Sequence, residues 1–223
     1  FADLIRRYSQ FVYSTARRQT RDTHIAEDVT QAVFILLANK ARSIRDDAAL
    51  SNWLFTTTRY ASANAMRMLS RRREHEEQAA RSAPMIQEIG PDDLEQLSPV
   101  LDEALAQLPE SDRAGVLMSF FENHTFRQIG SALHISEEAA RKRVSRALDK
   151  MRGFLISRGV TVSPAVIVER MQRIGSGAPS AEFVDSIIRV SSMTGGSLSG
   201  ATASANIANG VKHMWLMTKV KMA

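Results

Sequence analysis

Four polar side chains within residues 137–154 have the types and the spacing of a surface that could recognise an anion. At 100° per residue they share one side of a helix, and they are Arg141, Lys142, Ser145 and Arg146. The apolar residues of the same stretch gather on the opposite side, and they are Ala140, Val144, Ala147, Leu148 and Met151. One side is therefore predicted to pack, while the other is free to enter the major groove of B-DNA.

A second helix and a short turn precede this basic helix. The apolar spacing from Phe126 to Leu133 predicts a helix of eight or nine residues, and the turn His134-Ile135-Ser136 follows it. Ser136 can cap the next helix, whose first turn carries Glu137 and Glu138 at the positive end of the helix dipole. A helix, a three-residue turn and a second, capped helix are the pattern of a helix-turn-helix unit. The plainer alternative is the solvated face of an ordinary amphipathic helix.

No constellation typical of catalysis is found in the sequence. The chain has no cysteine, and its five histidines form no pair at metal-ligand spacing with a third ligand. A glycine-rich phosphate loop and a nucleophile motif are also missing from the sequence. We therefore expect no enzyme activity, no catalytic residue, no metal and no cofactor.

The elements that must position the basic helix are predicted to be α-helices throughout. The 223 residues contain 44% hydrophobic and only 6% aromatic residues, and helical apolar spacing recurs along most of the chain. Three prolines and an excess of acids mark residues 81–99 as a flexible acidic linker. We expect an all-α protein with two small helical domains, 1–80 and 100–159, the second containing the helix-turn-helix, and a partly helical extension, 160–223.

Residues 100–159 resemble the promoter-reading domain of a bacterial RNA polymerase sigma factor of the extracytoplasmic-function group, in the sigma-70 family. The similar run is LDEALAQLPESDRAGVLMSFFENHTFRQIGSALHISEEAARKRVSRALDKMR. The resemblance implies that Arg141, Lys142, Ser145 and Arg146 meet the minus-35 element of promoter DNA. The family usually has glycine in the turn where this chain has His134, and a left-handed turn costs more for histidine.

Residues 1–80 resemble the N-terminal domain of the same group. Within it, AEDVTQAVFILLANK is similar to the segment that binds core RNA polymerase, which implies contacts at Asp28, Gln31, Phe34 and Leu37. The spacing of Phe34 and Leu37 equally predicts that both belong to the core.

The segment SNWLFTTTRYASANAMRMLSRRR resembles the family helix that meets the minus-ten element as the DNA strands open. The resemblance implies contacts at Trp53, Arg59, Arg67 and Arg71, where arginines neutralise phosphates and the aromatic ring offers a surface to unstacked bases. A core position for Trp53 is the alternative.

Residues 160–223 exceed what a minimal member of this group needs. Short helices are predicted at 164–174 and 181–190, whereas the Ser, Ala, Gly, Thr and Asn composition of 195–210 predicts little burial. The apolar residues of the short helices must dock on the rest of the chain or on the polymerase, and they are Val166, Ile167, Met171, Phe183, Val184, Ile187 and Ile188. Docking could hide the basic helix or the core-binding helix and so inhibit the protein. The resemblance also implies the opposite alternative, an extension that assists transcription.

The resemblance implies a cytoplasmic factor that binds core RNA polymerase and directs promoter-specific transcription initiation. Control by a separate anti-sigma factor and intramolecular inhibition by residues 160–223 are both open, and a membrane anchor beyond Ala223 is a further hypothesis. The competing function is an autonomous helix-turn-helix regulator that does not bind polymerase core. Such a protein would need a palindromic site and a self-complementary dimer interface.

Overall fold

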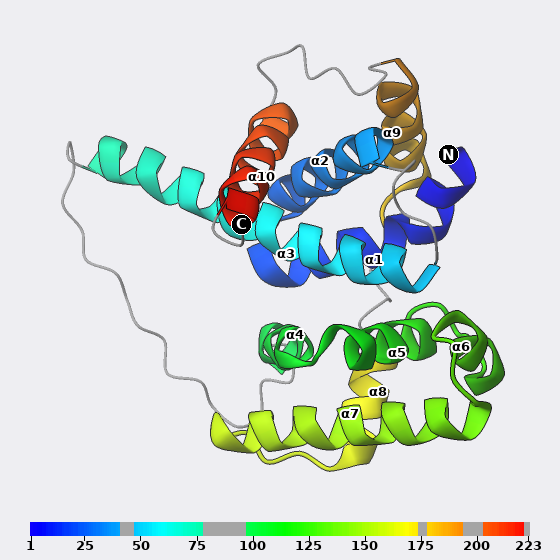
Figure 1. Cartoon of the computed structure of the whole chain (residues 1–223). Helices are drawn as coiled ribbons and strands as arrows, with labels where there is room; N and C mark the ends of the chain where they lie inside the picture. The colour runs from blue at the N-terminus through cyan, green and yellow to red at the C-terminus, as the bar shows by residue number, and fades with distance from the viewer. Residues whose placement is uncertain (41–46, 78–96, 174–177, 194–202, 221–223) are drawn as a thin grey trace.

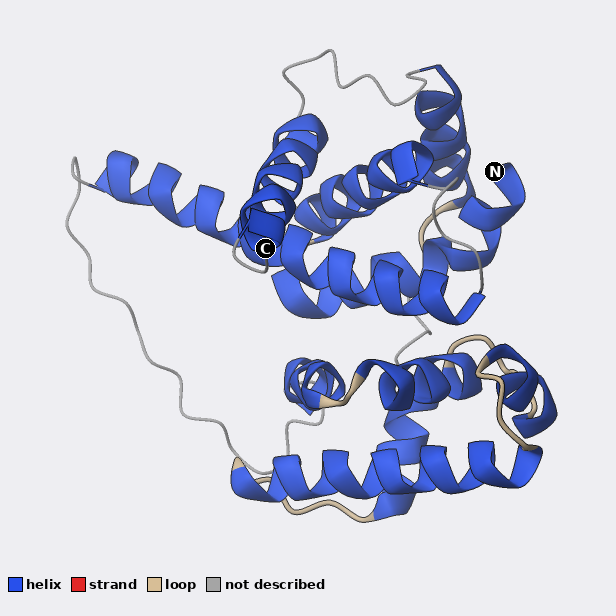
Figure 2. Ribbon diagram, viewed as in Figure 1, coloured by secondary structure: helices blue, strands red, loops and turns tan. Residues whose placement is uncertain are grey.

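The computed structural model describes residues 1–40, 47–77, 97–173, 178–193 and 203–220, and these residues are helical with no strand. The all-α prediction is confirmed. The helices form two layers, one below the other in the view of Figure 1. Figure 2 shows the same arrangement by secondary structure, with helices joined by short loops where the connections are described.

The upper layer is built on three long helices from the first part of the chain. They are α1 (Ala2–Thr20), α2 (Thr23–Lys40) and α3 (Asp47–Glu77). Helix α2 is central, because nine of its residues are buried, including Val33, Phe34 and Leu37. Two helices of the extension complete this layer, α9 (Ala181–Met193) and α10 (Ala203–Val220).

The lower layer contains the predicted helix-turn-helix. Its helices are α4 (Leu97–Gln107), α5 (Glu110–Phe120), α6 (Phe126–Ala132), α7 (Glu137–Ser157) and α8 (Pro164–Arg173). Helix α4 begins at Leu97, so the prediction that the linker reaches residue 99 is wrong by three residues. Proline is tolerated in a first helical turn, where its missing N–H has no partner to lose. The rest of the predicted linker, 81–96, lies outside the described residues.

The two layers share a core. One continuous cluster of buried apolar residues runs from Val12 and Leu54 of the upper layer through Leu117 and Leu155 of the lower layer. A smaller cluster within the helix-turn-helix contains Met118, Ile129, Ala140 and Val144. The helix-turn-helix is therefore packed by its own residues, while the lower layer as a whole rests on the upper one.

The extension docks on both layers. Ile167 and Met171 of α8, Ile187 of α9, and Ile207 and Val211 of α10 are all buried in the shared cluster. Of the two docking partners that the sequence left open, the structure shows the rest of the chain. The prediction of little burial in 195–210 is wrong from Ala203 onward, because alanine, serine and glycine let one helix approach another closely and so bury small side chains.

Candidate nucleic-acid interface and core-binding helix

The turn that orients α7 is defined by local hydrogen bonds. Thr125 and Gln128 form a capping box at the start of α6, and the Ser136 hydroxyl accepts a hydrogen bond from the amide of Ala139 at 3.1 Å. His134 has φ 55°, in the left-handed region that the resemblance expects for glycine. Gly130 is needed as well, because an added Cβ would lie 2.8 Å from the carbonyl oxygen of Ile135. The backbone of the two helices thus meets at Gly130.

Replacing His134 with glycine should stabilise the protein. The side chain is exposed, so the substitution removes backbone strain and loses no buried contact. We expect a gain of about 0.5–1 kcal/mol in the free energy of unfolding, after the entropy that glycine adds to the unfolded chain is deducted. Chemical denaturation measures it, and His134→Ala is the matched control, which should give no gain. Lower stability of the glycine variant would contradict the account of the turn.

The outer side of α7 carries all four predicted minus-35 residues. Arg141, Lys142, Ser145 and Arg146 are exposed, while Ala140, Val144, Ala147 and Met151 are buried beneath them and Leu148 is half-buried. Acids in the first turn hold two of the cations on this face, since Glu137 lies 3.9 Å from Arg141 and Glu138 lies 3.4 Å from Lys142. These exposed pairs are weak, so the side chains can exchange them for phosphates or bases.

The structure adds Arg127 to this basic face. It projects from α6 with 87% of its side chain exposed, and its Nε lies 3.5 Å from Glu137. Two other cations of α7 are held on the protein instead, because both Lys150 and Arg143 contact Asp112 of α5. Sequence spacing could not distinguish the cations of the basic face from those paired with Asp112, because the pairing depends on how α5 packs against α7.

The predicted minus-ten residues divide along α3. Arg67 and Arg71, in the second half of the helix, are exposed. Figure 1 shows the C-terminal end of α3 extending away from both layers. Trp53 and Arg59 are half-buried, and Trp53 packs on the core cluster. Burial lowers the pKa of Arg113 on α5, and Glu110 opposes this shift while Arg59 adds to it. Arg113 also donates a hydrogen bond to Asn52, so α5 contacts α3 near its start.

The predicted core-binding residues of α2 fall into two groups. Phe34 and Leu37 are fully buried in the core, so the prediction that they contact a partner is not supported and the core alternative holds. Asp28 and Gln31 are half-buried, and α10 lies beside them. The Ser204 hydroxyl of α10 lies 2.9 Å from a carboxylate oxygen of Asp28 and 2.8 Å from the side-chain oxygen of Gln31. It can donate its hydrogen to either one.

Helix α10 also approaches α3 closely. The Asn64 side chain donates a hydrogen bond to the carbonyl oxygen of Ile207 at 3.4 Å, and a Cβ added to Gly210 would lie 2.2 Å from the Asn64 amide nitrogen. Figure 1 shows α10 lying across both α2 and α3. A residue with a side chain at position 210 would not fit without movement of Asn64.

The residues that the structure describes contain no group of three or more His, Cys, Asp or Glu residues able to hold a metal ion. None of the helices there is both long and apolar enough to cross a membrane.

Comparisons with known proteins agree with the geometry. Residues 4–73 match the family description "Sigma-70 region 2", and residues 104–153 match "Sigma-70, region 4". The RNA polymerase sigma factor CarQ of Myxococcus xanthus is 30% identical over 70% of this chain and 88% of its own length. The extracytoplasmic-function sigma factor SigE of Mycolicibacterium smegmatis is 27% identical over 69% of this chain and 60% of its own length.

The comparison with solved structures also found a similar protein. Its structure contains the sigma factor RpoE in complex with the anti-sigma factor NepR from Bartonella quintana, at 21% identity over 65% of this chain and 89% of that chain. Its TM-score is 0.28, which is too low to transfer the arrangement of helices from one protein to the other.

Two helical layers, an exposed basic recognition helix and a second basic helix define a DNA-binding protein of the transcription machinery. The chain belongs to the sigma-70 family of RNA polymerase sigma factors, within the extracytoplasmic-function group. Members of this family bind core RNA polymerase and promoter DNA and direct promoter-specific initiation. This membership argues against an autonomous regulator that does not bind polymerase core.

Proposed function

We propose that this sigma factor is restrained by its own C-terminal extension, which covers the core-binding surface of α2. The observation that carries the proposal is the position of Ser204. Its hydroxyl lies within hydrogen-bond distance of the side-chain oxygens of both Asp28 and Gln31. These two residues are the polar members of the segment that resembles the polymerase-binding helix of the family. A polymerase that used them would have to displace α10.

The path of the extension supports the same proposal. Helix α8 packs on α5 and α7, whereas α9 packs on α1 and α2, with the rings of Phe183 and Tyr13 6.4 Å apart. Helix α10 then crosses α2 and α3. An attached segment that holds both layers acts at a high effective concentration, so even a weak contact can mask a surface.

The other residue roles are part of the proposal. Residues 1–80 would bind core polymerase and meet the minus-ten element, with Arg67 and Arg71 accessible and Trp53 and Arg59 half-buried on α3. Residues 100–159 would read the minus-35 element through the exposed face of α7. That face is open in this arrangement, so masking would act on core binding and not on the recognition helix.

A charge placed on α10 tests the masking of α2. Ser204→Asp would set a carboxylate beside Asp28, and like charges about 3–4 Å apart repel by several kcal/mol at protein surfaces. The change lies in the first turn of α10, where an acid suits the helix dipole, so the helix itself should persist. We expect affinity for core polymerase to rise at least ~10-fold, measured by fluorescence anisotropy.

Asn206→Asp is the matched control for this variant. It adds the same charge to the same helix at an exposed position, and it should leave the affinity unchanged. Equal core binding by the two variants, with α10 shown by hydrogen exchange to be released in Ser204→Asp, would contradict masking. Failure of every form to co-elute with core polymerase would contradict the sigma-factor function of this chain.

A further inference from the structure

Arg141 of the basic face is held by two neighbouring side chains. The central carbon of its guanidinium lies over the ring of Phe126, the first residue of α6, at 5.3 Å from the ring centroid. Its Nη2 lies 3.9 Å from a carboxylate oxygen of Glu137, one turn earlier on α7. The Arg141 side chain is still 60% exposed, so these contacts hold it without covering it.

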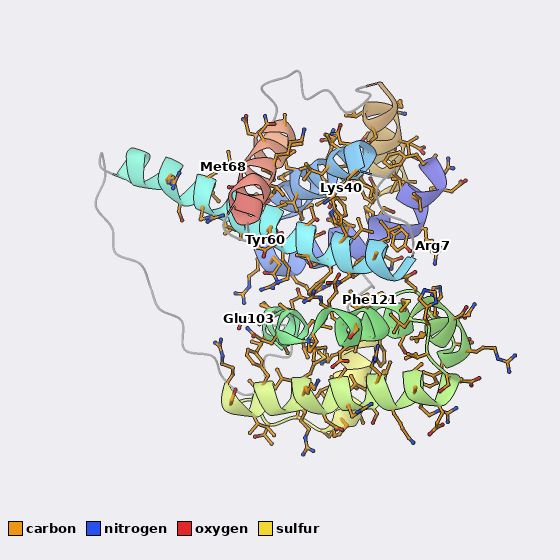
Figure 3. All side chains as sticks on the ribbon, in the orientation of Figure 1. Arg7, Lys40, Tyr60, Met68, Glu103 and Phe121 are labelled. Atoms are coloured by element: carbon orange, nitrogen blue, oxygen red, sulfur yellow. The ribbon has the colours of Figure 1, made fainter. Side chains whose placement is uncertain are left out.

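Helix α6 takes part in both contacts, because Glu137 is also paired with that helix. The second carboxylate oxygen of Glu137 lies 3.5 Å from the Nε of Arg127 on α6. Phe126, Arg127 and Glu137 therefore connect α6 to Arg141, and we call these three residues the α6 clamp. Figure 3 shows α6 and the first turns of α7 together at one end of the lower layer, where side chains project outward from both.

The backbone that carries the α6 clamp is closely fixed. The capping box at Thr125 sets the start of α6, where Phe126 stands, and the cap at Ser136 sets the start of α7, where Glu137 stands. The two helices meet at Gly130, where an added Cβ would lie only 3.3 Å from the amide nitrogen of Glu137. The ring of Phe126 also packs against the buried cluster of the helix-turn-helix. The clamp is therefore in place before any DNA is bound.

The neighbouring cations of the basic face are held in a different way. Lys142 pairs with Glu138 at 3.4 Å, and the Nε of Arg146 donates a hydrogen bond to the carbonyl oxygen of Lys142 at 3.2 Å. Both contacts lie within one exposed helix, and such contacts are weak and exchange readily with water. Arg141 adds to its own weak ion pair a contact with an aromatic ring on a second helix.

Reading a base requires a well-placed arginine. An arginine recognises guanine through two parallel hydrogen bonds, which come from N–H groups at the edge of the guanidinium plane. A contact with an aromatic ring engages the face of that plane, so the N–H groups at its edge stay available. Ordering a mobile side chain on binding costs conformational entropy, and a side chain that is already held avoids part of this cost. The clamp therefore suits recognition of a base by Arg141.

We propose that Phe126 is a positioning residue for sequence recognition, which holds Arg141 where its edge meets a base, with Glu137 and Arg127 as the polar part of the same clamp. The proposal rests on the proposed role of α7 at the minus-35 element. It makes the base preference that Arg141 contributes depend on the ring at position 126. The contribution of Arg146 does not depend on that ring.

Two variants at position 126 separate the ring from the apolar packing. Phe126→Leu keeps an apolar side chain against the helix-turn-helix cluster and removes the ring, whereas Phe126→Tyr keeps the ring. Core polymerase with the full chain is incubated with a DNA duplex library randomised over the promoter region, and the bound fragments are sequenced. We expect the base preference that Arg141→Ala abolishes to fall roughly 3- to 10-fold in Phe126→Leu and to be retained in Phe126→Tyr.

A double-variant cycle distinguishes positioning from a merely structural role. In the Arg141→Ala background, Phe126→Leu should cause no further loss of base preference, because the ring then has no cation to hold. Arg146→Ala is the matched control background, in which Phe126→Leu should keep its whole effect. An equal further loss in both backgrounds would overturn the proposal, and so would an undiminished base preference in Phe126→Leu with native helicity.

A measurement on the free chain requires neither polymerase nor promoter. In the NMR spectrum, the Nε–H group of Arg141 should show the ring-current shift of Phe126 and restricted motion, both lost in Phe126→Leu and kept in Phe126→Tyr. A freely mobile Nε–H group in the native chain would contradict the clamp. Failure of the native chain to bind core polymerase would instead refute the proposed function, while the spectrum of the free chain would still show whether the clamp exists.

Discussion

Removing residues 160–223 should make the remaining chain bind core RNA polymerase roughly 10- to 100-fold more tightly. The apparent affinity of a masked protein is its intrinsic affinity multiplied by the fraction in which the surface is free. Docking that is 90–99% complete, as expected for a tethered segment, accounts for this range. The truncation removes Ser204 from Asp28 and Gln31, and it also removes α9 from α1 and α2.

A second variant, which ends after Met193 and so has a smaller deletion, is the best comparison for this truncation. That form keeps α8 and α9 and loses α10, so it separates masking of α2 from the bridging of the two layers. Both forms need native helicity by circular dichroism, because each deletion removes buried residues and leaves their apolar partners exposed. Both forms lose Ile207 and Val211, and the form that ends at residue 159 also loses Ile167, Met171 and Ile187. Weaker transcription by a folded truncation would make the extension an activator.

Replacing both Arg141 and Arg146 with alanine should nearly abolish recognition of the minus-35 element. Both side chains are exposed on the outer face of α7. Arg141 lies over the ring of Phe126 at 5.3 Å, an exposed-side contact whose loss should leave the buried cluster of the helix-turn-helix in place. A side chain that reads a base contributes about 1–3 kcal/mol, so the pair should cost on the order of 2–6 kcal/mol, or at least ~30-fold in affinity. Each lost phosphate contact should also reduce the salt dependence of binding.

Lys150→Ala is a control on the same helix that removes one positive charge, to be compared with each single arginine variant. Lys150 lies on the same helix, but its ammonium group contacts Asp112 at 2.7 Å, so its removal should change DNA affinity little. Footprinting on a promoter fragment measures protection at minus 35 separately from minus ten. Undiminished protection at minus 35 in the double variant would remove α7 from the reading surface.

The sequence alone determined the recognition unit. Thr125, Gln128 and Ser136 form caps with backbone groups three residues away, and such short contacts can be predicted from spacing. The basic and apolar sides of α7 follow from a period of 3.6 residues, and the structure keeps them as predicted. The cost of His134 in the turn was also predictable, since few residues tolerate the left-handed region.

Only the tertiary structure decided which surfaces are free. Phe34 and Leu37 could be contact or core residues on spacing alone, and the helices packed around α2 bury them. The composition of 195–210 predicted little burial, because small residues bury little area by themselves, yet Ala208 in the first half of α10 is fully buried beside α2 and α3. Glu122 accepts hydrogen bonds from Arg7 and Ser51 and gave no signal, because both donors are more than 70 residues away in sequence. Caps and amphipathic periods are short-range interactions and can be predicted from the sequence, whereas burial and long-range pairing depend on which helices meet.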